Sequence, residues 1–186
     1  MTQLKNKIAI VTGSGGGFGE GIAQAYVREG ARVIVADING EAAKRVASAL
    51  GAHASPFTCD VSRGDQVQAL VAHCVSTFGI PDIVVNNSGT THKNRPMLEV
   101  DEVMFDRIFN VNVKSIFHMT RAVVPLMRER KGGAIINIGS TAGIRPRPGL
   151  TWYNASKGAV NLVSKSMAAE LGPDNIRVNA ICPVMG

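Results

Sequence analysis

The stretch "KIAIVTGSGGGFG", residues 7–19, decides the fold that this chain is expected to adopt. It opens with a short apolar, β-branched run that is typical of a strand buried on both faces, and a helical pattern starts at about residue 18. Between them, glycine fills four of the five positions 13–17. A glycine-rich turn lets the backbone approach a phosphate closely, and the helix that follows offers free N–H groups and the positive end of its dipole. The stretch therefore predicts a strand–turn–helix unit that binds a dinucleotide.

The glycine spacing departs from the G-x-G-x-x-G pattern, which fits no frame of this loop. Gly13, Gly17 and Gly19 are spaced as G-x-x-x-G-x-G. A plain glycine-rich turn is the alternative interpretation. Glycines lose much conformational entropy on folding, so a turn without a ligand would not favour four of them.

The rest of the chain alternates short apolar runs with longer helical patterns. The apolar runs predict strands at 7–12, 32–37, 55–60, 82–87, 133–140 and 176–182. The helical patterns lie between them at about 18–29, 40–50, 63–78, 101–130 and 153–171. Strands buried on both faces and separated by helices indicate an α/β fold with a doubly wound, Rossmann-type parallel sheet. We expect residues 1–186 to form a single catalytic domain, incomplete at its C-terminus because the chain stops directly after a strand.

Composition narrows the classes of function. The net charge of +6 comes without a long Lys/Arg block and with only 5% aromatic residues, which argues against nucleic acid as a partner. The odd set Cys59, Cys74 and Cys182 contains no C-x-x-C pair, so a reducing compartment fits and a disulfide framework does not. The apolar stretch at the N-terminus is too short for a signal peptide or a membrane span, so we expect a cytoplasmic protein.

The four histidines show no spacing that is typical of metal ligands, so no metal is expected. They are expected to be surface or packed residues: His53, His73, His92 and His118.

Asp37 ends the second predicted strand, 18 residues beyond Gly19. A carboxylate at that point can accept hydrogen bonds from both ribose hydroxyls of an adenosine and would repel a 2′-phosphate. No Lys or Arg lies in the glycine loop or directly after Asp37. We therefore expect NAD to be preferred over NADP.

A tyrosine and a lysine lie one helical turn apart in "TWYNASKG", residues 151–158. Residues i and i+4 share a helix face, so Tyr153 and Lys157 are expected to point into the same space. A tyrosine is a poor base at neutral pH, but an ammonium group one turn away favours its phenolate form. Ser140 precedes Tyr153 by thirteen residues, at the end of a predicted strand. Ser140 and Tyr153 are therefore both expected at the carboxyl edge of the sheet, where ligands bind in open α/β folds.

These residues stand in an order that resembles the classical subgroup of the short-chain dehydrogenase/reductase family over essentially all 186 residues. Each motif is weak alone, and the set in this order is specific. The segments that carry the resemblance are "TGSGGGFG" (12–19), "CDV" (59–61), "NNSG" (86–89, with Ser88 where the family has alanine), "NVNVKSIF" (110–117), "INIGSTAG" (136–143), "YNASK" (153–157) and "RVNAICP" (177–183).

The resemblance implies an NAD(P)-dependent oxidoreductase that interconverts a secondary alcohol and a ketone by hydride transfer. Tyr153 would be the general base for oxidation and the acid for reduction, and Lys157 would favour its phenolate and bind the nicotinamide ribose. Ser140 would hydrogen-bond the substrate oxygen, and Asn112 would hold a water that links Lys157 to solvent. The implied cofactor-binding residues are Gly13, Ser14, Gly17, Phe18, Gly19, Asp37, Asp60, Val61, Asn87, Gly89, Tyr153, Lys157 and Pro183.

Further implications concern assembly and completeness. The family packs as homotetramers or homodimers through the two long helices, here about 101–130 and 153–171. Pro183 is followed by Val184 where the family usually has glycine, which adds bulk near the nicotinamide. After residue 186 the family places a substrate-covering segment, a further helix and a seventh strand.

Two loops are expected to rim the site and to bear on the substrate. The first carries His92, Lys93 and Arg95, and the second carries Arg145, Arg147 and Trp152. This positive rim favours a small-molecule alcohol or ketone that bears an anionic group, with Trp152 as an apolar wall. Solvated loop charges are the alternative interpretation.

Three other functions remain open at this point. The first is a sugar-nucleotide epimerase or dehydratase of the extended branch, which also uses the Y-x-x-x-K motif. The second is a non-catalytic NAD-binding sensor, and the third is an inactive fragment. The spacing of the glycine loop argues against the first, and the intact set of Asn112, Ser140, Tyr153 and Lys157 argues against the second.

Overall fold

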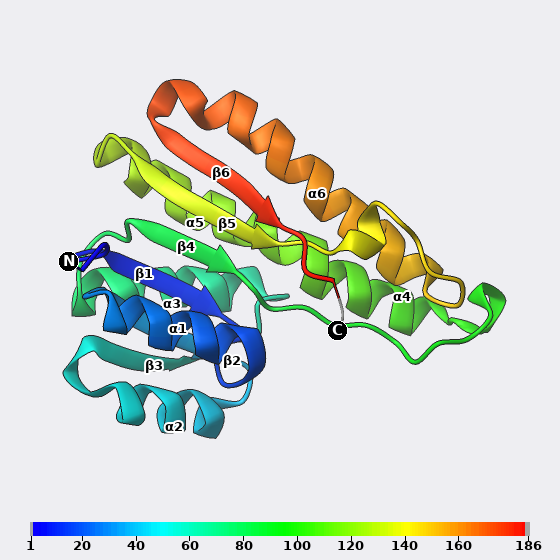
Figure 1. Ribbon diagram of the computed structural model, residues 1–186, viewed down its shortest axis with the longest axis horizontal. Coiled ribbons are helices and arrows are strands. Elements are labelled where there is room, and N and C mark those ends of the chain that lie inside the picture. Colours follow the sequence, from blue (N-terminus) through cyan, green and yellow to red (C-terminus); the bar gives the residue numbers. More distant parts are fainter. Residues whose placement is uncertain (1, 185–186) are drawn as a thin grey trace.

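The computed structural model describes residues 2–184, which form one parallel sheet with helices on both faces (Figure 1). The six strands lie in the order β3-β2-β1-β4-β5-β6. Their bounds are β1 Ile8–Thr12, β2 Arg32–Asp37, β3 Ala54–Thr58, β4 Ile83–Asn86, β5 Gly133–Ile138 and β6 Ile176–Ile181. The strand order reverses between β1 and β4, which opens a crevice at the carboxyl ends of these strands. The predicted doubly wound α/β fold is confirmed.

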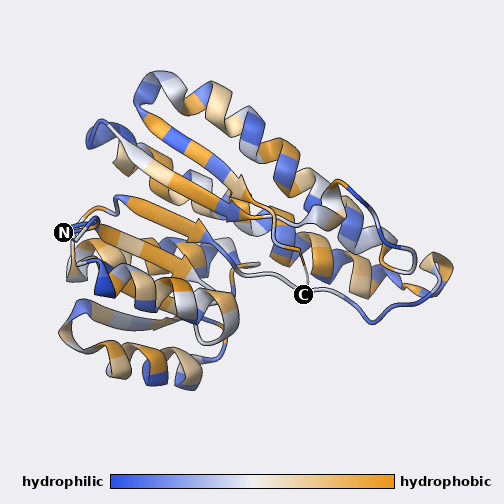
Figure 2. Ribbon diagram, in the orientation of Figure 1, coloured by the Kyte–Doolittle hydropathy of each residue, from blue (hydrophilic) through white to orange (hydrophobic). Residues whose placement is uncertain are grey.

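Alternate side chains of the central strands pack against different helices. One face of the sheet is covered by α3 (Gly64–Thr77), α5 (Ser115–Glu129) and α6 (Thr151–Leu171), and the other by α1 (Gly17–Arg28) and α2 (Gly40–Leu50). In β1, Ile8 and Ile10 belong to the first core, whereas Ala9 and Val11 belong to the second. Burial on both faces explains why the central strands are hydrophobic along their whole length (Figure 2).

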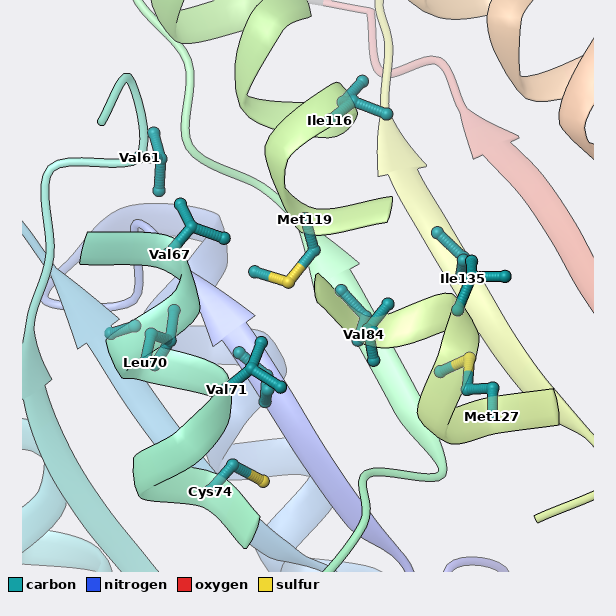
Figure 3. Close-up of a cluster of buried hydrophobic side chains, with 14 of the residues drawn as sticks. Val61, Val67, Leu70, Val71, Cys74, Val84, Ile116, Met119, Met127 and Ile135 are labelled. Carbon is teal, nitrogen blue, oxygen red and sulfur yellow. The ribbon is translucent and has the colours of Figure 1, made fainter. Parts of the chain in front are cut away.

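The larger core lies between α3, α5 and the sheet (Figure 3). Leu70 and Val71 of α3 and Met119 of α5 meet Val84 of β4 there, and each is at most 4% exposed. This apolar layer fixes the two helices on the sheet and leaves the carboxyl ends of the strands to polar loops.

A chain of buried polar groups joins β4, β5 and α6. Asn86 Nδ2 donates to Asn137 Oδ1 over 2.8 Å, and Asn137 Nδ2 donates to Ser164 Oγ over 2.9 Å. Ser164 Oγ in turn donates to the carbonyl of Val160. A buried polar group without a hydrogen-bond partner would lower the stability of the fold. This series of hydrogen bonds therefore favours one register of β4, β5 and α6.

The structure corrects the predicted helix 101–130, which is two helices. The first, α4, spans Glu102–Phe109, and a π-helical turn at Asn110–Lys114 separates it from α5. Asn112 lies in the middle of that turn and is 3% exposed. Such π turns inside helices are frequently found at functional sites.

The start of the last helix also differs from the prediction. α6 begins at Thr151, two residues before the predicted start, so Trp152 lies in the helix and not in the loop before it. Within residues 2–184, no helix has both the length and the apolar character that crossing a membrane requires.

Candidate active site

The loops after β1 and β4 are hydrogen-bonded to each other because these strands are neighbours. Asn87 Nδ2 donates to the carbonyl oxygens of Thr12 (2.8 Å) and Gly13 (3.0 Å). Thr12 Oγ1 accepts hydrogen bonds from the backbone N–H groups of Asn87 and Ser88, each over 3.1 Å. The "NNSG" segment therefore holds the glycine loop in place.

The glycine loop joins α1 through a very close backbone approach. A Cβ at Gly19 would overlap the carbonyl oxygen of Gly13, so only glycine fits there. Ser14 is buried, and its Oγ donates to the carbonyl of Val11 over 2.7 Å. Ser14 thus supports the loop from within, whereas Phe18 is 70% exposed at the start of α1, next to Gly17.

Cavity A, about 800 Å³, lies at the carboxyl ends of β1, β2 and β4. Asp37 lines it, with one carboxylate oxygen accepting from Gly15 N–H and the other from Asn39 N–H, both over 2.9 Å. Asp60 lines it as well, and its Oδ1 accepts from the backbone N–H and the hydroxyl of Ser62. Seven of the predicted cofactor-binding residues line cavity A: Gly13, Phe18, Asp37, Asp60, Val61, Asn87 and Gly89.

Cavity B, about 480 Å³, adjoins cavity A at four shared residues. They are Phe18, Asn87, Gly89 and Thr90. Ser140, Tyr153, Lys157, Pro183 and Val184 line its other side. Cavities A and B therefore form one continuous cleft along the carboxyl edge of the sheet, running from Asp37 to Tyr153.

Lys157 is a buried amine in this cleft, 5% exposed. Its Nζ donates to the carbonyl of Ile138 over 2.7 Å and lies 6.0 Å from the centre of the Tyr153 ring. Burial lowers the pKa of Lys157 to about 8, against a smaller opposing effect of Cys182. The Lys157 amine is therefore mostly protonated at pH 7 and can release its proton at about pH 8.

Asn112 joins the loop after β4 to α6. Its Oδ1 accepts from Thr90 N–H over 2.7 Å, and its Nδ2 donates to the carbonyl of Thr90 and to Ser156 Oγ, both over 2.9 Å. A Cβ at Gly89 would lie 3.5 Å from both Asn112 Oδ1 and Lys157 Nζ. Asn112 and Lys157 thus reach the same side of Gly89.

Ser140 follows β5 and begins the 3-10 turn Thr141–Gly143, which packs against α6. Its Oγ accepts from Ala142 N–H over 3.0 Å, and its carbonyl accepts from Asn161 Nδ2. A Cβ at Gly143 would lie 2.6 Å from the nitrogen of Gly158 and 2.7 Å from the carbonyl oxygen of Lys157. This backbone contact sets the position of Ser140 relative to Tyr153 and Lys157.

Cavity C, about 350 Å³, adjoins cavity B at Thr91, Ser140 and Tyr153. From the predicted rim, His92 and the exposed Arg147 line it. Lys93, Arg95 and Arg145 lie on the same two loops and do not line it.

The expectation that Trp152 forms an apolar wall of the site is wrong. Its ring packs edge-on against Phe105 of α4, with centroids 5.3 Å apart, and its Nε1 donates to the carbonyl of Met97. Leu150 lines cavity C in its place. Trp152 lies in the first turn of α6, which begins two residues earlier than the sequence suggested, and packs against α4. Within residues 2–184 no cluster of three or more metal-ligating side chains occurs.

Known proteins share this arrangement. The family model described as "short chain dehydrogenase" matches residues 7–185. The chain belongs to the short-chain dehydrogenase family. The family resemblance seen in the sequence is thereby confirmed, and it places the chain among oxidoreductases.

Relatives within the family cover nearly the whole chain. The 4-formylbenzenesulfonate dehydrogenase of Comamonas testosteroni is 42% identical over 99% of this chain and 74% of its own length. The 3-oxoacyl-(acyl-carrier-protein) reductase of Thermotoga maritima is 36% identical over 97% of this chain and 74% of its own length. A crystal structure of 3-ketoacyl-(acyl-carrier-protein) reductase from Brucella melitensis complexed with NADH matches with a TM-score of 0.97 at 42% identity, over 98% of this chain and 77% of that one.

Sequence reasoning missed one charged group beside the glycine loop. Arg45 of α2 donates to the carbonyl of Gly15 and forms an ion pair with Glu20 of α1, each over 2.9 Å. Arg45 lies 30 residues from Gly15 in the chain, and no motif marks it. Its charge is therefore close to Asp37 but is engaged by Glu20.

The contact between Gly143 and α6 predicts opposite effects of two alanine substitutions. Gly143→Ala would press a methyl group onto the backbone of Lys157 and lower the free energy of unfolding by about 1–3 kcal/mol. Gly158→Ala is the matched control, because its Cβ would meet Gly143 O at an ordinary 3.6 Å. It should raise stability by about 0.5–1 kcal/mol through helix propensity. Urea unfolding of both variants measures these changes in the free energy of unfolding. A Gly143→Ala variant as stable as the unsubstituted protein would contradict the close contact between Gly143 and α6.

Proposed function

We propose that this chain is an NAD-dependent oxidoreductase that interconverts a secondary alcohol and a ketone by hydride transfer. One observation carries the proposal. Ser140, Tyr153 and Lys157 line cavity B, which is continuous with a cleft that has the features of a dinucleotide site. The proposal treats residues 1–186 as a nucleotide-binding catalytic domain.

The residues of cavity A fit a dinucleotide with an unphosphorylated ribose. The glycine loop leads into the N-terminus of α1, where free N–H groups favour a pyrophosphate. The Asp37 carboxylate is oriented by Gly15 and Asn39 and keeps lone pairs for two ribose hydroxyls. A nicotinamide cofactor bound there supplies the hydride acceptor or donor.

Tyr153 is proposed to move the proton of the reaction. In oxidation the Tyr153 phenolate takes the proton of the alcohol hydroxyl while a hydride leaves the carbon that bears this hydroxyl. In reduction Tyr153 returns the proton to the carbonyl oxygen. The Lys157 ammonium group is buried 6.0 Å from the centre of the Tyr153 ring, where its positive charge can stabilise negative charge on the Tyr153 oxygen. Ser140 Oγ donates a hydrogen bond to the substrate oxygen as charge develops on it.

Asn112 is proposed to link Lys157 to solvent through a water. Asn112 Oδ1 and Lys157 Nζ flank Gly89, and a pKa of about 8 lets Lys157 exchange a proton near neutral pH. The same hydrogen bonds from Asn112 to Thr90 and Ser156 keep the loop after β4 against α6.

The names of the relatives support the reaction class and differ in substrate. They include a dehydrogenase of 4-formylbenzenesulfonate, reductases of acyl-carrier-protein substrates and a xylitol dehydrogenase. The xylitol dehydrogenase is a crystal structure with NAD+ bound. It is 33% identical over 97% of this chain and 71% of that one, with a TM-score of 0.93. For this chain we therefore propose a small-molecule alcohol or ketone without naming the compound.

Assembly as a homodimer or homotetramer is also proposed. Exposed apolar side chains on α5 and α6 give these helices a surface that another subunit could cover, namely Phe117 (54% exposed) and Leu162 (65%).

Tyr153→Phe tests the proposed chemistry. The variant keeps the ring and loses the hydroxyl, so it should still bind NADH and lose turnover by at least a thousandfold, the order expected when a proton-transfer group and its charge stabilisation are both removed. Absorbance of the reduced nicotinamide, measured over a panel of alcohols and ketones, reports turnover. Retained turnover in the variant would refute the role of Tyr153, and cofactor binding without any turnover in the unsubstituted protein would favour a sensor.

Asp37→Asn tests the cofactor preference. Without the carboxylate charge, the ratio of kcat/KM for NAD to that for NADP should fall at least tenfold, because a 2′-phosphate is no longer repelled. Glu41→Gln is the matched control, since Glu41 is an exposed carboxylate that pairs with Lys44 on α2. An unchanged ratio in Asp37→Asn, or a preference for NADP before any substitution, would contradict the assignment.

A further inference from the structure

The side of α6 that carries Tyr153 and Lys157 extends to a third polar residue, Asn161. Asn161 lies one helical turn after Lys157 and two turns after Tyr153, so the three share one side of the helix. Lys157 Nζ donates to the carbonyl of Ile138 over 2.7 Å. Asn161 Nδ2 donates to the carbonyl of Ser140 over 3.2 Å. Two successive turns of α6 therefore bind alternate carbonyl groups at the end of β5.

The amide of Asn161 also contacts the segment that follows β6. Cys182 Sγ donates to Asn161 Oδ1 over 3.2 Å. Because the Ser140 carbonyl oxygen only accepts, the amide nitrogen must face Ser140, and the amide oxygen then faces the thiol. This position requires one donor and one acceptor on a short side chain. An aspartate would lack the donor, and a leucine of similar size would lack both.

The loops after β5 and β6 lie side by side and leave a fitted space for this amide. The two strands are paired, and α6 lies beside them (Figure 1). Thr141 N–H donates to the carbonyl of Pro183 over 3.3 Å. A Cβ at Gly139 would overlap Asn161 Oδ1 and lie 3.1 Å from Cys182 Sγ, so only glycine leaves room for the amide there.

Both loops line cavity B, where the reaction is proposed to occur. Ser140 and Pro183 belong to its wall. Ser140 is proposed to hydrogen-bond the substrate oxygen, and Pro183 is among the proposed cofactor-binding residues. Transfer between two bound groups requires the reacting atoms to approach to about 3–3.5 Å, and a misplacement of about 1 Å can slow a reaction on the order of a hundredfold. The spacing of the two loops therefore bears directly on the rate.

We propose that Asn161 is a positioning residue for hydride transfer. Its amide ties the Ser140 carbonyl to the Cys182 thiol and so fixes the spacing between the loop that holds the substrate oxygen and the loop that faces the nicotinamide. The described residues that line cavities A, B and C do not include Asn161, so it acts through Ser140 and Cys182 and not on the ligands. This inference rests on the proposed function.

Two variants of similar size test the role of the amide. Asn161→Leu removes the donor and the acceptor, and Asn161→Asp removes only the donor to Ser140. Each is assayed with NADH and a carbonyl compound that the unsubstituted protein reduces, and the NADH-binding sites are counted by fluorescence titration. Turnover per NADH-binding site should fall about tenfold or more in both variants, because the reacting groups are misplaced while cavity A is intact. Gln68→Glu, an amide-to-carboxylate change at an exposed position of α3, is the matched control and should leave turnover unchanged.

A merely structural role of Asn161 would give a different result. Variants that only unfold more easily would have fewer NADH-binding sites and the same turnover at each site. That outcome would overturn the proposal.

Alkylation of Cys182 by iodoacetamide tests the contact without turnover. The thiolate is the reacting form, and a hydrogen bond that the thiol donates disfavours it. Asn161→Leu should therefore raise the rate about threefold or more, whereas Asn161→Asp, which keeps the acceptor and adds a negative charge, should lower the rate. Mass spectrometry follows each cysteine separately. Burial raises the pKa of Cys59 and of Cys74 to about 12, so these two thiols should react slowly and report any unfolding.

The two measurements separate the possible failures. Equal alkylation rates at Cys182 in all three proteins would refute the contact with Asn161. Altered alkylation with unchanged turnover per site would refute the positioning role alone. An unsubstituted protein that binds NADH and reduces no carbonyl compound would instead refute the proposed function.

Discussion

The backbone contact between Gly143 and helix α6 is the constraint on which the candidate site depends. Ser140 follows β5 and Tyr153 lies in α6, so the two side chains come from different elements and need a fixed separation. The 3-10 turn lies so close to Lys157 and Gly158 that no side chain fits at Gly143. Packed backbones leave little room for adjustment, and the separation is therefore set by the fold and not by flexible side chains.

Lys157 shows how the fold tunes the chemistry of this site. Burial removes water from the amine and lowers its pKa to about 8, while the Ile138 carbonyl accepts one of its hydrogens. The parallel order of β1, β4 and β5 brings cavities A, B and C into one row at the carboxyl edge. A long ligand can thus extend from Asp37 past Lys157.

Much of the fold could be predicted from the sequence, because buried parallel strands and glycine turns leave strong local signals. All six strands and the glycine loop lie within two residues of the expected positions. The π turn at Asn110–Lys114 could not be predicted, since it depends on contacts of Asn112 with Thr90 and Ser156, 22 and 44 residues away. The orientation of Trp152 and the burial of His92 likewise depend on how loops distant in sequence pack together. The predicted site residues were placed by motif, whereas their hydrogen-bond partners required the structure.

The central claim is that this cleft holds a nicotinamide cofactor in one orientation and directs its hydride to a carbonyl carbon beside Ser140 and Tyr153. Two forms of NADH, each carrying deuterium on one face of the nicotinamide C4, test this directly when a carbonyl compound is reduced and the alcohol is analysed by mass spectrometry. The account predicts that one form delivers deuterium to the carbinol carbon and that the other delivers none. Deuterium from both forms, or from neither, would contradict it.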